Sequence, residues 1–247
     1  GVARFSGYVC QPGSDKDIDT NFAGIVTATL YDRKEKVVCK DNQKSLQGDN
    51  EPFTFYERAK NLYRGNAKAK DGRFEFVLTI PRDISYSEEP GRISLYAISD
   101  DKKQEYSGYT ENFCMNGTAA EADQDSIPPV VMLYINNIDN PDYTITDENP
   151  VLIADIYDEC GINNAGVALG HDIELVLDDD NASYINLKSY FNYDFGSYQK
   201  GQIVYPMTGI SRGLHKASLR VWDVNNNYSV SDVHFIVRGD YHDGMMT

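Results

Sequence analysis

Apolar and polar residues alternate with a period of two along most of this chain. Phe74, Phe76 and Leu78, for example, are separated by Glu75 and Val77. This spacing is typical of strands that bury one side. It recurs in segments near 26–30, 93–97, 173–177, 217–221 and 233–237, and the apolar run at 130–135 is also interpreted as a strand. Helical periodicity is weak everywhere, and only 52–63 is compatible with a short helix. The pattern therefore predicts an all-β fold.

Turn-forming residues separate these segments and divide the chain into two parts. They include Asp71-Gly72, Pro90-Gly91, 211–213 and 225–227, which are typical of connections between strands. A small, acidic stretch before Pro128-Pro129 predicts a linker. We expect two consecutive β-sandwich domains over 1–118 and 128–238, the second immunoglobulin-like. Between them lies a linker at 119–127, and a flexible tail follows at 239–247.

The charge balance excludes several classes of function. The 247 residues contain 38 Asp and Glu against 23 Lys and Arg, which gives a formal net charge of −15. Nucleic-acid binders need a basic face, so a nucleic-acid partner is not expected. No apolar run approaches the roughly 18 residues of a membrane-spanning helix. Because residue 1 is glycine and no signal-peptide pattern follows, we expect the chain to be a segment of a longer polypeptide.

The cysteines and histidines contain no recognisable catalytic pattern. Cys160 and His171 are the closest such pair in sequence, but Cys160 follows acidic residues that would disfavour its thiolate. We therefore interpret Cys160 as a turn residue. The four cysteines fit two disulfides or four free thiols equally well. We predict no catalytic residue in this chain.

No metal or cofactor motif is expected either. The stretch Asp223-x-Asn225-x-Asn227 begins like a calcium loop but has Tyr228 where such loops need glycine. Asp178 to Asp180 fails because Ala182 and Ser189 occupy the fifth and twelfth positions, and both stretches are interpreted as solvated turns. Calcium held by another loop geometry is left open. The predicted sets of metal-binding and cofactor-binding residues are empty.

One group of aromatic residues is a candidate interaction surface. Tyr190, Tyr193 and Tyr198 belong to the densest aromatic cluster of the chain. Exposed tyrosines stack on sugars, so a surface carbohydrate-binding or adhesin module is an alternative function. The competing interpretation places alternate members of the cluster in the core. Trp222, the only tryptophan, is out of phase with its strand and is expected to face outward unless a bulge intervenes.

Several spaced motifs together resemble a known family. They are 152–163 (LIADIYDECGIN), 170–173 (GHDI), 197–206 (SYQKGQIVYP), 213–215 (GLH) and 221–227 (VWDVNNN). In this order they resemble the C-terminal portion of the type IX secretion system sortase of Bacteroidetes, a gingipain-like cysteine peptidase of the C25 class. The first half of the chain is similar too, through 72–76 (GRFEF) and 91–97 (GRISLYA).

The resemblance implies a role but no catalytic residue. It implies a non-catalytic region that braces an upstream catalytic domain of the same protein or presents the C-terminal signal domains of exported cargo. Other secretion-system proteins are further expected partners. It also implies an extracytoplasmic location, at the outer membrane or cell surface of a Gram-negative bacterium. The His-Gly dipeptide typical of the family's catalytic histidine is absent, since His171 precedes Asp172.

Overall fold

The described chain is built from strands. The computed structural model describes residues 2–40, 52–81, 88–115, 125–139, 142–165 and 171–238. These residues form 17 strands and one short 3-10 helix, Lys188–Tyr190, so the all-β prediction is confirmed. No helix in the described part of the chain is long and apolar enough to span a membrane.

The short helix predicted at 52–63 is wrong. This segment contains strand β4 (Thr54–Glu57) and the first residues of strand β5 (Asn61–Ala69). β4 pairs with β3 (Glu35–Val38), and Val37 lies opposite Phe55. Aromatic residues favour strands, and backbone pairing with a segment about twenty residues earlier overrides the weak local helical pattern.

The first sandwich consists of a four-stranded sheet faced by a two-stranded ribbon. The sheet has the order β5-β2-β7-β8 and the ribbon pairs β1 with β6. The further strands are β1 (Val2–Tyr8), β2 (Gly24–Tyr31), β6 (Arg73–Thr79), β7 (Arg92–Ser99) and β8 (Glu105–Thr110). Val26, Leu30, Phe76 and Leu78 are nearly inaccessible to solvent. The predicted alternation therefore places its apolar members in this core.

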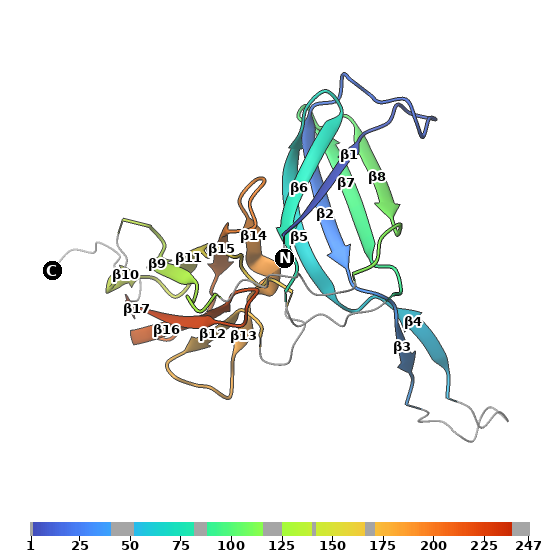
Figure 1. The fold of residues 1–247 in the computed structure, drawn as a ribbon. Helices are drawn as coiled ribbons and strands as arrows, with labels where there is room; N and C mark the ends of the chain where they lie inside the picture. The colour runs from blue at the N-terminus through green and yellow to red at the C-terminus, as the bar shows by residue number, and fades with distance from the viewer. Residues whose placement is uncertain are drawn as a thin grey trace.

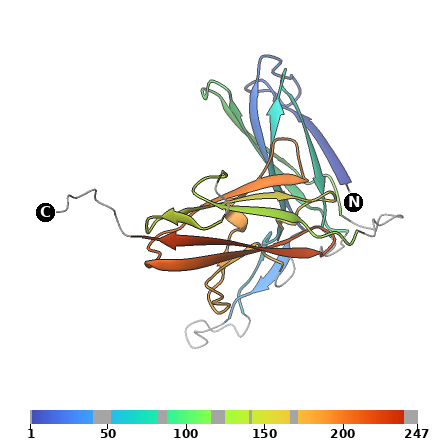
Figure 2. The same ribbon diagram turned by 90° about the vertical axis from the view of Figure 1, so that its left-hand side faces the viewer.

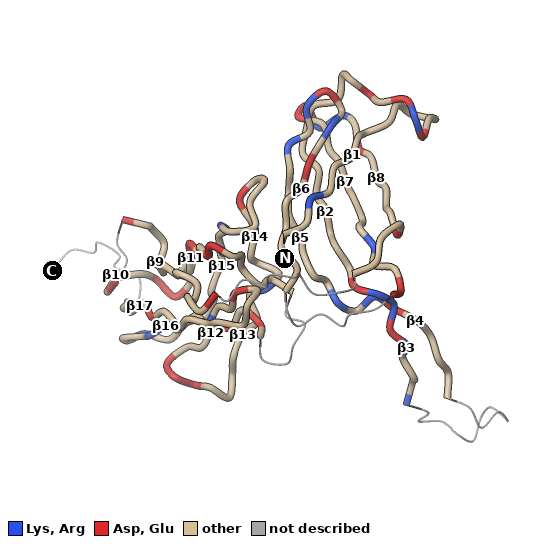
Figure 3. Tube along the Cα trace, viewed as in Figure 1, with Lys and Arg blue, Asp and Glu red and all other residues tan. Residues whose placement is uncertain are grey.

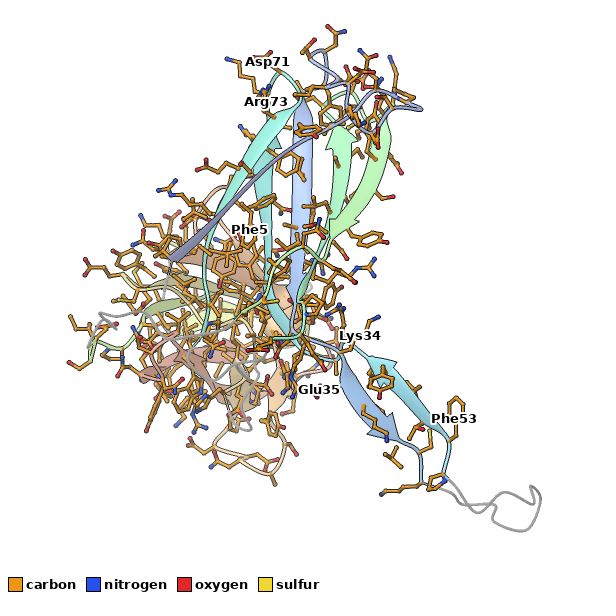
Figure 4. All side chains as sticks on the ribbon, turned by 45° about the vertical axis from the view of Figure 1, so that its right-hand side comes forward. Phe5, Lys34, Glu35, Phe53, Asp71 and Arg73 are labelled. Atoms are coloured by element: carbon orange, nitrogen blue, oxygen red, sulfur yellow. The ribbon has the colours of Figure 1, made fainter. Side chains whose placement is uncertain are left out.

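A tight turn carries the chain from the sheet to the ribbon. Asp71 and Gly72 both have positive φ, 51° and 71°, as a two-residue hairpin turn requires. A side chain at Gly72 would overlap the backbone oxygen of Asp19, so glycine is needed there for space as well as conformation. The predicted turn at Asp71-Gly72 is confirmed, and Figure 4 shows it at the end of the sandwich remote from β3 and β4.

The second sandwich has the strand arrangement of an immunoglobulin domain. Its sheets have the orders β14-β15-β11-β9 and β10-β17-β16-β12-β13, which correspond to strands D-E-B-A and A′-G-F-C-C′ of that fold. The strands are β9 (Val130–Ile135), β10 (Thr144–Thr146), β11 (Val151–Tyr157), β12 (Glu174–Leu177), β13 (Ile185–Asn186), β14 (Phe191–Tyr193), β15 (Lys200–Pro206), β16 (Gly213–Trp222) and β17 (Tyr228–Val237).

The core of the second sandwich follows the predicted phase. Leu175, Leu219 and Phe235 are fully buried between the two sheets. Trp222 is outward, as its phase predicts, but only half-exposed. Its ring lies between His171, 4.0 Å away, and Tyr228, 4.7 Å away, measured between ring centroids.

The two sandwiches meet at an angle, and a hairpin stands apart from both. Figures 1 and 2 show the second sandwich against the β5 and β6 side of the first. β3 and β4 pair only with each other within the described chain and project away from the body (Figure 1). All four cysteines are free thiols, which decides between the two interpretations of the sequence. The tail at 239–247 and most of the predicted linker lie outside the described residues.

Candidate functional site

The feature that most distinguishes this structure is the joint between the two sandwiches. We define the joint by Tyr63 and Thr79 of the first sandwich and by Gly161, Tyr193 and Tyr198 of the second. Tyr63 and Tyr193 stack with ring centroids 5.2 Å apart and planes inclined by 24°. Both rings are buried, with exposed fractions of 2% and 7%. Offset stacking of this kind stabilises beyond the burial of apolar area alone.

One hydrogen bond and close packing fix the two rings. The hydroxyl of Tyr193 donates to the carbonyl oxygen of Ile162 at 2.6 Å. A side chain at Gly65 would overlap the Tyr63 ring, so this glycine makes room for the ring above β5. Burial raises the pKa of Tyr63 to about 12 and raises that of Tyr193 as well. Both hydroxyls therefore stay protonated at physiological pH.

A second contact closes the joint beside the tyrosines. Gly161 has φ of 120°, a conformation that favours glycine. A Cβ there would overlap the Thr79 hydroxyl oxygen and lie 3.0 Å from the Tyr198 ring. The amide of Gly196 also donates to the carbonyl oxygen of Asn66 at 3.2 Å. The turn at 160–161 thus approaches the first sandwich closely because Gly161 has no side chain.

Three carboxylates lie next to the joint, where the linker reaches the second sandwich. Oxygens of Asp125, Asp158 and Asp223 all lie within 4.8 Å of one another. Asp158 is 4% exposed and Asp223 is 0% exposed. Because Asp223 is fully buried, the interpretation of its turn as solvated is wrong. The alternation that buries Ala217, Leu219 and Val221 continues to Asp223 and could have predicted its inward position.

Each carboxylate is engaged by hydrogen-bond donors of the chain itself. Asp158 Oδ1 accepts the amides of Cys160 and Gly161 at 2.9 and 2.7 Å. Asp223 Oδ1 accepts the amides of Asn225 and Asn227, and its Oδ2 accepts Asn227 Nδ2 at 2.7 Å. Oxygen ligands of this type suit Ca²⁺ or Mg²⁺, but these donors already give the cluster a structural explanation.

The carboxylates differ in their affinity for protons. Burial, with a further contribution from the negative charge of Asp223, raises the pKa of Asp158 to about 6. Burial also raises the pKa of Asp223. The amide of Ile127 and the side chains of Cys160 and Asn225 lower the pKa of Asp125. The cluster therefore combines one half-buried, readily ionised carboxylate with two buried ones that resist ionisation.

The cluster and its neighbours attach the linker to the second sandwich. Asn227 Nδ2 donates to the backbone oxygen of Asp125 at 3.1 Å. The hydroxyls of Ser229 and Ser231 donate to the backbone oxygens of Pro129 and Val131 at 2.7 and 3.0 Å. These bonds join residues about one hundred positions apart. They hold the end of the linker along strand β17.

The cysteine and histidine considered as a catalytic pair have other partners. The thiol of Cys160 donates a hydrogen bond to Asp125, and a carboxylate partner disfavours the thiolate that a nucleophile needs. His171 stacks on Trp222. The buried His215 contacts Asp178 Oδ2 at 2.8 Å and the backbone oxygen of Ser211 at 2.7 Å. Because His215 contacts the backbone carbonyl oxygen of Ser211 and not its hydroxyl, this contact does not activate the serine as a nucleophile.

The three tyrosines of the predicted interaction surface do not share one surface. Tyr190 is 39% exposed and packs edge-on against Tyr205. Tyr193 is buried in the joint, and Tyr198 is half-buried beside Gly161. Of the three, only Tyr193 contacts the first sandwich among the described residues, through its stack on Tyr63. This agrees with the alternative interpretation, in which alternate members of the cluster are core residues.

Comparison with solved structures gives an informative match. The chain is similar to PorU. The crystal structure of dimeric latent PorU from Porphyromonas gingivalis is 29% identical, with a TM-score of 0.54, over 97% of this chain. The chain spans only 22% of that PorU chain.

Other comparisons add little. Fibronectin(III)-like modules of CbhA from Clostridium thermocellum align over 100% of this chain and 90% of theirs, but at 9% identity and a TM-score of 0.28. That likeness is too weak to support an inference. No protein-family model and no curated protein matches the chain.

Proposed function

We propose that this chain is the non-catalytic β-sandwich region of a type IX secretion sortase, and that it braces the catalytic domain of that protein. The similarity to PorU over 97% of the chain carries the proposal. It agrees with the ordered motifs that led to the same family from sequence. The corresponding location is extracytoplasmic, at the outer membrane or cell surface.

The geometry of the joint supports a bracing role. A brace must keep its two ends at a fixed separation and angle. The Tyr63–Tyr193 stack and the approach of Gly161 to Thr79 connect the sandwiches directly, while hydrogen bonds to Asp125 fix the linker. Because the stack and the Gly161 contact involve two separate segments of the second sandwich, the angle between the sandwiches is set at more than one point.

The proposal also requires that the isolated chain be inactive. Purified chain is incubated with a peptide carrying a C-terminal signal sequence of an exported protein, and cleavage is followed by mass spectrometry. We expect no cleavage above buffer. Cleavage that is lost on Cys160→Ala, but kept on replacement of the exposed thiol in Cys114→Ala, would refute the non-catalytic assignment.

Bracing is tested in the complete protein to which the chain belongs. Gly161→Val places a branched side chain against Thr79 and should open the joint, whereas Gly209→Val has nothing within 4 Å of the added Cβ. Both positions have positive φ, 120° and 69°, so both variants add backbone strain, which is larger at Gly161. We expect uncleaved cargo to accumulate only with the first variant. Equal processing by the two variants would contradict a bracing role.

A further inference from the structure

An open groove of about 840 Å³ runs over the outward side of the second sandwich. Its volume lies within the roughly 300–1,000 Å³ that is typical of sites for small ligands. Figure 1 shows the three strands beneath it, β9, β11 and β15, in one sheet. We call this feature the sheet groove and define it by the outward side chains of these strands that line it, namely Val130, Met132, Asp155, Tyr157, Lys200 and Gln202.

The pairing of the strands arranges the floor of the sheet groove in rows. In one row, Gln202 of β15 lies directly opposite Asp155 of β11. In the next row, Tyr157 of β11 lies between Lys200 of β15 and Val130 of β9. Side chains that lie opposite each other on one side of a sheet are close enough to interact. A polar row therefore runs beside a row that is centred on an aromatic ring.

The polar row offers hydrogen bonds of both kinds. Gln202 Nε2 donates to Asp155 Oδ1 at 2.7 Å, and this bond holds an amide and a carboxylate side by side. A carboxylate accepts hydrogen bonds, whereas an amide both donates and accepts them. Neighbouring hydroxyls on a sugar ring also donate and accept. The pair of Asp155 and Gln202 is therefore suited to hold two adjacent sugar hydroxyls.

The neighbouring row offers an apolar surface. Tyr157 is 39% exposed, and Val130 and Met132 are 54% and 51% exposed. The outward side of a sheet of this kind is ordinarily polar, so three such side chains along a groove are unusual. A tyrosine ring is apolar over its body and polar at its tip. A sugar ring likewise has an apolar C–H side and a hydroxylated edge, so it can lie on Tyr157 while its hydroxyls reach the polar row.

The connection between β14 and β15 forms a fixed rim of the groove. Asp194 and Gln199 of this connection also line the groove. The amide of Asp194 donates to the carbonyl oxygen of Lys200 at 3.0 Å. The hydroxyl of Ser197 accepts the amides of Gln199 and Lys200 at 3.1 and 3.0 Å, and Gln199 Nε2 donates to the backbone oxygen of Glu159 at 2.6 Å. Because these bonds order the rim in advance, a ligand loses less entropy on binding.

Charge and position narrow the class of ligand. The lining contains Asp155 and Asp194 against Lys200, and segment 128–238 contains 15 Asp and Glu against 6 Lys and Arg. Figure 3 shows acidic residues distributed over the second sandwich, which disfavours nucleic acids and anionic polysaccharides. Extended peptides commonly add to a free sheet edge through backbone hydrogen bonds, but β11 beneath the groove is paired on both sides. A neutral sugar chain fits these limits.

We propose that the sheet groove binds a neutral oligosaccharide, with one sugar ring on Tyr157 and its hydroxyls on Asp155 and Gln202. The site is distinct from the tyrosines that the sequence suggested for sugar stacking, because none of them lines the groove. It is also independent of the bracing role, since no residue that defines the joint lines the groove. Failure of one proposal therefore leaves the other standing.

The test is native gel electrophoresis of the full 247-residue chain in gels that contain dextran, mannan, galactomannan, xyloglucan or the anionic polymer alginate. Retardation at increasing polymer concentration gives the Kd. We expect at least one neutral polymer to retard the chain and alginate to leave its mobility unchanged. Tyr157→Ala and Gln202→Ala should each raise the Kd about tenfold or more. Tyr109→Ala, at a position 64% exposed on β8 of the first sandwich, is the matched control and should change the Kd by less than about twofold.

A conservative variant separates stacking from a general loss of structure. Tyr157→Phe keeps the ring and should bind within about threefold of the unaltered chain, and circular dichroism confirms that each variant is folded. Three results would each overturn the proposal: no retardation by any of the neutral polymers, retardation by alginate alone, or equal weakening by Tyr109→Ala. Binding of a lysine oligopeptide that Tyr157→Ala abolishes, without retardation by a neutral polymer, would also overturn it and would assign the groove to a basic peptide.

Discussion

Replacing Asp158 by Asn should stabilise the second sandwich at neutral pH. The pKa of Asp158 rises from 3.8 to about 6 because the carboxyl is buried beside another acid. Each unit of pKa difference between folded and unfolded chain corresponds to about 1.4 kcal/mol, so ionisation costs the folded state up to about 3 kcal/mol. Asparagine keeps an oxygen for the amides of Cys160 and Gly161 and carries no charge.

The sign of the pH dependence follows from the raised pKa. The folded chain holds this proton more tightly than the unfolded chain, so stability falls as pH rises between about 4 and 6 and stays reduced above that window. The gain from Asp158→Asn should be near zero at pH 4. It should reach about 2 kcal/mol at pH 7.5, after allowance for relaxation around the site.

Urea unfolding at both pH values measures this gain. Fluorescence of Trp222, the only tryptophan, reports on the second sandwich, in which Asp158 lies. Asp155→Asn, three residues earlier on β11 and facing outward, is the control and should change stability by less than about 0.5 kcal/mol. Destabilisation by Asp158→Asn at pH 7.5 would refute the reasoning, because it would mean that the charged carboxylate is required. A bound divalent cation would produce that result, and EDTA would then lower the Tm of the unaltered chain.

Two further predictions concern the joint. Gly161→Ala should lower the free energy of unfolding by about 1–3 kcal/mol, through positive φ and the overlap with Thr79. Gly209→Ala should lower it by about 1 kcal/mol from backbone strain alone. Urea unfolding of the two variants gives both values, and equal costs would argue against the overlap. Tyr193→Phe should cost about 1 kcal/mol by removing the hydrogen bond to Ile162. Tyr193→Ala should cost about 3–5 kcal/mol through lost packing, and a cost near zero on thermal unfolding would show that the ring is not buried.

The strands could be predicted from sequence because each buried side is encoded locally. Phe76 and Leu219 lie in runs whose period of two needs no knowledge of the partner strand. The same period of two places Asp223 inward, but an acidic residue in an acidic chain is more readily interpreted as part of a solvated turn than as a buried carboxylate. The strand at 54–57 was missed since its pairing with β3 depends on a segment distant in sequence.

The joint could not be predicted in the same way. The contact between Tyr63 and Tyr193 joins residues 130 positions apart, and neither has a local pattern that names the other. Period-two alternation places Tyr193 inward, yet it does not say that the ring meets the first sandwich. The hydrogen bond from Asn227 to Asp125 likewise depends on where the linker meets the second sandwich. Long-range contacts of this kind follow from the packing of two domains and not from local propensity.

Residual dipolar couplings of backbone amides test most directly whether the joint makes one rigid body of the two sandwiches. The couplings are measured in weakly aligned, isotope-labelled chain and fitted separately for each sandwich. We predict that both sandwiches give the same alignment tensor in magnitude and orientation. Tensors of clearly different magnitude would mean that the sandwiches reorient independently, which would contradict a bracing role.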